Sequence, residues 1–310
     1  MRRELLLEFN SSLFIVKMLY FCKVNNMKLM NNWLFWVIVY LVSAIIFAQT
    51  FKKANRKMKN AGSLTILLEV FTALFALLFI PLFDFVWPHL ESIIVLGVVV
   101  IIYAFTDRLN IEVRYGLDPS IFSMLKQLST VFLIILGFIF LKEELVLKRV
   151  VGAGIIVFAN FLLAFEAGKF KINRYFIMAV ISNLLFAVAM LINVNISDNF
   201  NLGIYTMCTV LFPAILIFIF EKHSVKELKK EFKRYNKKDF LISAFTWCLM
   251  LISSVRAYQI GNVSVVAPLL TLTAILNTAY EYFINKNKSK FIQKLIASIL
   301  ILIGVLLVKI

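Results

Sequence analysis

Runs of about 20 mostly apolar residues recur along almost the whole chain, and they constrain the fold more than any other feature. A transmembrane α-helix needs about that many apolar residues to cross a bilayer. Candidate spans lie near 33–50, 64–82, 92–115, 120–141, 150–165, 175–194, 203–220, 240–258, 263–283 and 291–308. The runs therefore predict an all-α polytopic membrane protein with ten transmembrane helices and no soluble domain.

Composition agrees with a membrane environment. The chain is 62% hydrophobic with a mean hydropathy of +0.90, whereas an average soluble domain is about 45–50% apolar. Its formal net charge of +16 comes from basic residues placed between the apolar runs, so membrane orientation explains the charge better than nucleic acid does. The three cysteines are far apart. We therefore expect the lipid bilayer as a partner, and no nucleic acid, metal or cofactor.

The N-terminal segment 1–32 is an extension before the first span. It begins like a signal peptide, but Glu4, Glu8 and Lys17 interrupt its apolar core and no small-residue cleavage site follows. The segment either lies on the membrane surface or precedes the true start at Met27 or Met30, and we favour the late start.

Lysine and arginine give an independent check on the helix count. They cluster in the first, fifth, seventh and ninth predicted loops, whereas the second (83–91) and sixth (195–201) contain none. Short cytoplasmic loops collect these residues, and an error of one helix between the first and seventh loops would destroy the alternation. The pattern supports ten helices and predicts termini outside the cytoplasm.

A weak internal repeat appears when the sequence is shifted by 145 residues. Gly116 then aligns with Gly261, Arg149 with Lys294, and Ala159 with Gly304. The shift divides the chain into two five-helix repeats, 33–168 and 169–310. Because five is odd, the second repeat enters the membrane from the opposite face. Inverted repeats of this kind are typical of secondary transporters.

The end of the first repeat carries a family resemblance. An apolar run is followed by Leu141, Lys142 and Glu143 and by a helix with Gly152 and Ala159. This pattern resembles the EamA-type branch of the drug/metabolite transporter superfamily, whose repeats end with a Leu-Gly-Glu hinge and a glycine-containing fifth helix. The resemblance covers residues 33–308 and implies a ten-helix transporter of small organic solutes.

The chain departs from that family pattern in several places. Lys288 stands where Glu143 would align, and Thr130 and Ile275 stand where the family usually has proline. These departures leave the substrate open. The resemblance also implies cytoplasmic termini, against the loop charges. Either the termini lie outside, or an additional span within the first thirty residues returns the N-terminus to the cytoplasm.

Polar residues inside apolar spans are the candidate site residues, because an ionisable group at the bilayer centre costs about 2.5–3.5 kcal/mol and usually faces the bundle interior or a cavity. Lys126 lies near the middle of the fourth span and either lines a substrate path or pairs with a carboxylate. Glu69 in the second span is its candidate partner or a proton-coupling group. Lys126 shares one arc with further polar residues of its span: Ser120, Ser123, Gln127 and Thr130.

Other spans supply further candidates. In the third, Asp107 and Arg108 form a charged patch with Glu112, for which an interfacial ion pair is an equally good explanation. In the ninth, Asn277 and Tyr280 are candidate lining residues, and Glu281 ranks lower because it lies close enough to the helix end to reach water. Three more polar or aromatic residues lie in other spans. Trp247 could bind a cation or ring or simply pack, and interhelical hydrogen bonds are expected of Asn160 and Asn183.

The function expected from these features is transport of an amino-acid-like or drug-like solute by alternating access, as a proton-coupled exporter or an exchanger, in a prokaryotic inner membrane. A flippase for a lipid-linked sugar or phospholipid is the alternative. An intramembrane enzyme is disfavoured, because His89 and His223, the two histidines of the chain, lie in predicted loops. No G-x-x-x-x-G-K-[ST] motif occurs, so we do not expect ATP as the direct energy source. A homodimer could form through small residues of the tenth span, with lipid contact as the alternative.

Overall fold

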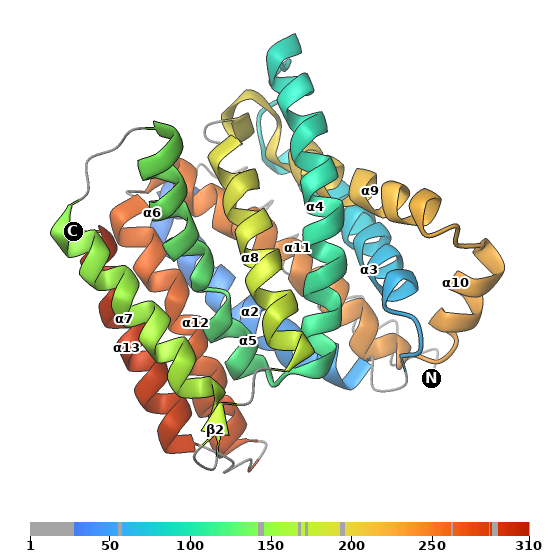
Figure 1. The fold of residues 1–310 in the computed structure, drawn as a ribbon. Helices are drawn as coiled ribbons and strands as arrows, with labels where there is room; N and C mark the ends of the chain where they lie inside the picture. The colour runs from blue at the N-terminus through green and yellow to red at the C-terminus, as the bar shows by residue number, and fades with distance from the viewer. Residues whose placement is uncertain are drawn as a thin grey trace. The chain divides into compact units, whose positions relative to one another are not determined.

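The computed structural model describes residues 28–54, 58–141, 146–166, 169–170, 173–192, 196–261, 263–284, 286 and 291–309. Helices account for most of these residues (Figure 1). Segment 1–27, the hinge residue Glu143 and Lys288 lie outside the described residues, so the expectations that concern them stay predictions. The side chain of Thr130 also lies outside the described part.

Each of the ten predicted spans contains helix. In chain order the elements are η1 Lys28–Asn31, α2 Trp33–Ala54, α3 Ala61–Ala76, η2 Leu77–Leu82, α4 Leu90–Gly116, α5 Pro119–Leu125, α6 Leu128–Leu141, α7 Leu147–Ala164, α8 Arg174–Ile192, η3 Ile196–Asn199, α9 Leu202–Phe220, α10 Val225–Phe232, α11 Lys237–Ile260, α12 Val263–Phe283 and α13 Phe291–Lys309. Between α7 and α8 lies a short antiparallel pair, β1 Phe165–Glu166 with β2 Lys169–Phe170.

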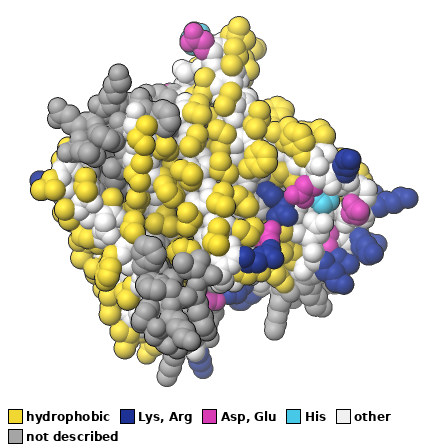
Figure 2. Space-filling model, viewed as in Figure 1, with side chains coloured by type: hydrophobic (Ala, Val, Ile, Leu, Met, Phe, Trp, Pro, Cys, Tyr) yellow, Lys and Arg dark blue, Asp and Glu magenta, His cyan; other side chains and the backbone are white. Residues whose placement is uncertain are grey.

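Five of the described helical segments are long and apolar enough to cross a membrane, namely 33–54, 61–82, 90–116, 202–220 and 237–260. Shorter apolar helices occupy 150–160, 174–190 and 291–307. Large apolar side chains are exposed along α4, including Ile94 and Phe105, and hydrophobic atoms cover much of the surface in Figure 2. This distribution suits a membrane-embedded protein, and the count of ten spans stays a prediction.

The chain forms two compact units, and each draws on both halves of the sequence. Unit 1 contains residues 1–100 and 195–262, and unit 2 contains 101–194 and 263–310. The boundary falls within α4. These units are distinct from the two proposed sequence repeats, whose inverted relation stays a prediction.

In unit 1, α2 packs along α11 and α3 along α9. At one end, Glu231 accepts hydrogen bonds from the backbone N–H groups of Lys59 and Asn60, joining the segment after α9 to the connection before α3. At the other end, the Asn201 amide donates to the backbone carbonyls of Ile80 and Phe83. The basic first and seventh loops therefore share one end, and the second and sixth loops share the other, as the alternation of charge predicts.

In unit 2, α13 packs against α7, α6 against α8, and α12 against α5. Ala297 and Ser298 are almost fully buried, and a Cβ at Gly304 would lie 2.8 Å from the Gly152 carbonyl oxygen. The small residues of the tenth predicted span thus pack inside the same chain. They do not form a free surface for a second copy, and the homodimer stays a prediction without an assigned face.

Two local features differ from the expectation. The span predicted as one helix, 120–141, is broken into α5 and α6 at Lys126 and Gln127. The seventh loop, for which only a basic composition was predicted, contains the helix α10. Its N-terminus is a capping box, in which the Ser224 hydroxyl accepts from the Glu227 N–H and the Glu227 carboxylate accepts from the Ser224 N–H.

Candidate functional site

The interruption between α5 and α6 organises the polar residues of unit 2. Ser129 N–H donates to the carbonyl of Lys126, 3.2 Å away, instead of reaching back four residues to Leu125. The Leu125 carbonyl accepts from the side-chain amide of Asn183 on α8 at 2.9 Å. A side chain inserted into the helical hydrogen-bond ladder is a known cause of breaks. Asn183 thus makes the predicted interhelical bond, whereas Asn160 donates to the Ile156 carbonyl of its own helix.

Several predicted site residues gather beside this break. The Lys126 ammonium lies over the Phe186 ring, 3.6 Å from its centroid, in a cation–π contact. Asn277 on α12 donates to the Ser123 hydroxyl at 3.0 Å, and the Gln127 amide donates to the Ser123 carbonyl. Ser123, Lys126, Gln127 and Asn277 are therefore brought together by α5, α8 and α12. Tyr280 is half-buried further along α12.

A buried ionic network lies at the start of α5. The Glu281 carboxylate accepts from the Ser120 N–H at 3.0 Å and from the Ser120 hydroxyl at 2.7 Å. Lys294 on α13 bridges Glu281 at 2.8 Å and Asp118 at 3.2 Å. Glu281 and Lys294 are both almost completely buried.

This network corrects one expectation. Glu281 does not reach water as its position near the helix end suggested, because Ser120 and Lys294 hold it inside unit 2. The sequence predicts no role for Lys294 beyond its alignment with Arg149 in the repeat. Its isolated positive charge at the start of an apolar span was the signal that could have identified it.

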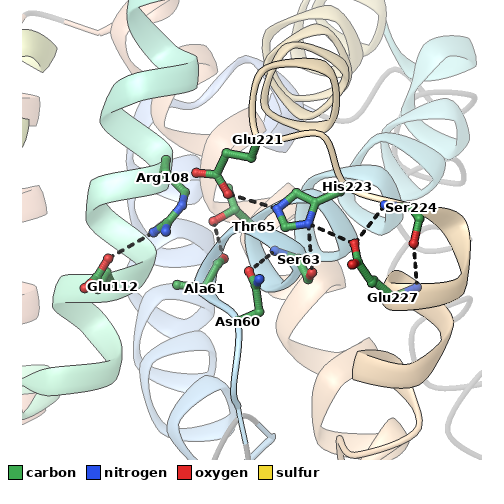
Figure 3. A network of polar contacts seen from close by, with 10 residues as sticks. All are labelled: Asn60, Ala61, Ser63, Thr65, Arg108, Glu112, Glu221, His223, Ser224 and Glu227. Atoms are coloured by element: carbon green, nitrogen blue, oxygen red, sulfur yellow. Dashed lines mark hydrogen bonds and ion pairs between the residues drawn. The ribbon is translucent and has the colours of Figure 1, made fainter.

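The charged patch on α4 has the ion pair expected from its spacing. Arg108 pairs with Glu112 at 3.1 Å (Figure 3), and Arg174 at the start of α8 also pairs with Glu112. Asp107 is half-buried. The Arg108–Glu112 pair lies within α4 and the Arg174–Glu112 pair joins α4 to α8, which agrees with the structural explanation of this patch.

Unit 1 holds two of the predicted site residues, Glu69, which is buried, and Trp247, which is half-buried. Glu69 lies on α3 together with the buried Thr65 and Thr72. Trp247 packs on Phe47, with ring centroids 4.8 Å apart. The Trp247 contact supports packing. Glu69 belongs to unit 1 and Lys126 to unit 2, and their pairing stays a prediction.

A second polar cluster, missed in the sequence, surrounds His223 after α9 (Figure 3). The His223 ring lies 2.9 Å from Glu221 and 3.7 Å from Glu227, and its Nδ1 is 3.5 Å from the Ser63 hydroxyl. Hydrogen bonds from the backbone and hydroxyl of Ser224, with the nearby His223, lower the pKa of Glu227 below its ordinary value. The S-x-x-E spacing of a capping box was the available sequence signal.

Among the described residues, no group of three or more His, Cys, Asp or Glu side chains could hold a metal ion. Searches with protein-family models and of curated proteins give no match to this chain.

Proposed function

We propose that the protein is a secondary transporter, resembling the EamA-type drug/metabolite transporters, that moves a small organic solute by alternating access. One observation carries the proposal: the break at Lys126 and Gln127 inside an otherwise apolar helix pair. Irregular backbone at membrane depth is tolerated only where protein buries it or where it lines an aqueous cavity. Secondary transporters typically build substrate sites from such discontinuous helices.

The polar groups beside the break suit recognition of a small solute. The Lys126 ammonium can attract an anionic group, and its contact with the Phe186 ring provides an aromatic surface nearby. Ser123 and Asn277 bond to each other and can orient a neutral polar group. Zwitterionic or amino-acid-like solutes fit this combination, and buried Glu69 is the candidate for proton coupling.

The protein would be a multi-pass component of a prokaryotic inner membrane, working as a proton-coupled exporter or an exchanger. Transport of a lipid-linked sugar or phospholipid is the second candidate, favoured by the large apolar side chains exposed along α4.

The test is solute counterflow in proteoliposomes loaded with pooled metabolites. We compare the native protein with Lys126→Met, Glu69→Gln and a matched control, Lys148→Met, whose lysine is exposed at the start of α7. We expect counterflow of a soluble solute that Lys126→Met abolishes and Lys148→Met retains. Folding is checked by thermal unfolding and gel filtration.

Two results would contradict the proposal. Folded native protein that exchanges no soluble pool but moves a fluorescent phospholipid across the bilayer would favour the flippase. Equal activity of Lys126→Met and native protein towards every transported solute would show that Lys126 is not part of the site. The break at Lys126 would then no longer support the proposal.

A further inference from the structure

One face of α10 fixes this helix to the rest of unit 1. The inward residues recur at helical spacing, with Leu228, Glu231 and Phe232 on the helix and Tyr235 just after its end. Glu231 accepts from the backbone N–H of Lys59 at 2.7 Å, and the Phe232 ring stacks on Phe71 with centroids 5.4 Å apart. Burial and the neighbouring Glu231 raise the pKa of Tyr235. The short helix is therefore a fixed part of the unit.

The opposite face of α10 is a stripe of lysines. The outward residues follow the same spacing, two positions earlier: Lys226, Lys229, Lys230 and Lys233, all exposed. Figure 2 shows the Lys and Arg atoms gathered over this helix. Within the described part of the chain, no ion pair joins any of these four lysines to a carboxylate. We call these four residues the lysine stripe.

The acidic residues of the same segment are engaged elsewhere. Glu221 bonds to His223 at 2.9 Å, and Glu227 closes the capping box. Asp239 accepts from the Asn236 amide. These carboxylates therefore do not pair with the lysine stripe. Its positive charges stay exposed and can bind a partner.

An exposed apolar surface ends immediately beside the lysine stripe. Ile219 and Phe220 at the end of α9 are 59% and 68% exposed, and Val225 at the start of α10 is 58% exposed. In a membrane-embedded protein such side chains contact acyl chains. The lysines follow within about one helical turn, and long lysine side chains place their ammonium groups at headgroup level while their stems cover apolar surface.

We propose that the lysine stripe binds the headgroups of anionic phospholipids in the adjacent leaflet. Clusters of four to eight basic residues beside a membrane helix attract anionic lipids, at roughly fivefold in affinity per residue near the surface. The position directly beyond the lipid-facing end of α9 favours a lipid over a soluble polyanion. This proposal is independent of transport.

The test uses the full-length protein in neutral detergent, titrated with phosphatidylglycerol or phosphatidylcholine and analysed by native mass spectrometry. The stripe variant is Lys226→Gln with Lys230→Gln and Lys233→Gln. The matched control loses the same charge from other exposed lysines, by Lys53→Gln with Lys148→Gln and Lys286→Gln. Both variants are first checked for native thermal unfolding, which the outward lysines are not expected to affect.

We expect native protein and the control to bind phosphatidylglycerol more tightly than phosphatidylcholine, and the stripe variant to lose about tenfold or more of this preference. Added salt should weaken the preference, because the charges are solvent-exposed. Equal losses in the two variants would mean that net charge, not the stripe, attracts the lipid. Displacement by inorganic phosphate at equal concentration, or no preference for phosphatidylglycerol, would also overturn the proposal.

Discussion

At the residue scale, the capping box of α10 shows how two side chains determine the direction in which a helix surface faces. Ser224 and Glu227 satisfy each other's backbone N–H groups at 2.9 and 3.2 Å. Without them the first turn of α10 would leave donors to water, and a helix of 8 residues has little stability of its own. The outward direction of the lysine stripe therefore depends on the cap as well as on Glu231.

Replacing the cap should loosen α10. Ser224→Ala removes the hydroxyl acceptor and is expected to destabilise the helix by about 1 kcal/mol, which corresponds to a roughly fivefold drop in amide protection at pH 7. Glu227→Gln keeps a side chain that can complete the box and should retain most protection. Hydrogen exchange of the α10 amides, corrected for intrinsic rates, measures both effects.

The same helix should respond to acid. Because the folded pKa of Glu227 is lowered, its stabilising effect is complete at neutral pH and is lost as the pH falls through that lowered value. Amide protection in native α10 should therefore decrease below the ordinary carboxyl range, and less so in Glu227→Gln. Glu231 is present in both proteins and serves as an internal control. Identical acid profiles would contradict the role given to Glu227.

At the element scale, the contact between α7 and α13 depends on Gly304. A Cβ at Gly304 would lie 2.8 Å from the Gly152 carbonyl oxygen and 2.8 Å from Ile156 Cγ1. The backbone cannot move aside at little cost, so the helices approach this closely only because residue 304 has no side chain. Gly154 on α7 offers a matched contrast, since a Cβ there meets nothing within 4 Å.

Gly304→Ala should therefore lower stability by about 1–3 kcal/mol through overpacking. Gly154→Ala should cost nothing and could stabilise α7, because alanine favours helix by up to about 1 kcal/mol over glycine. Thermal unfolding of the purified proteins in one detergent measures the difference. Equal midpoints for the two variants would show that α7 and α13 do not pack at Gly304 as described.

Sequence periodicity predicted where the helices lie much better than what interrupts them. Apolar runs locate all ten helical regions because length and hydropathy are local properties. The break at Lys126 has no proline or glycine to mark it, and Asn183, which binds the freed Leu125 carbonyl, is 58 residues away in sequence. Likewise, the burial of Glu281 depends on Lys294 and Ser120. Such partners come from tertiary packing, which periodicity does not encode.

At the scale of the whole molecule, the alternation of loop charge agrees with contacts inside each unit. In unit 1, Glu231 joins the first and seventh loops. In unit 2, Lys294 in the first turn of α13 reaches Asp118 before α5, so the start of the tenth predicted span lies beside the third loop. Both contacts bring together segments at odd-numbered loops. This is the arrangement that antiparallel membrane helices require, and it supports the proposed ten spans.

Thiol labelling in cells tests this arrangement. In a background lacking Cys22, Cys208 and Cys248, we expect Trp87→Cys, at a site 81% exposed in the second loop, to react with a membrane-impermeant maleimide in intact cells. Lys230→Cys on α10 should react only after permeabilisation, because basic loops stay in the cytoplasm.

Lys59→Cys is the control for the shared end, since its backbone bonds to Glu231, and it should label as Lys230→Cys does. Reversed labelling of Trp87→Cys and Lys230→Cys would show that the orientation in the membrane is inverted, while the two loops still lie on opposite sides. Labelling of all three sites from the same side would contradict the alternation itself. Labelling of Lys230→Cys in intact cells would place the lysine stripe away from the cytoplasmic leaflet, where anionic lipids attract basic segments.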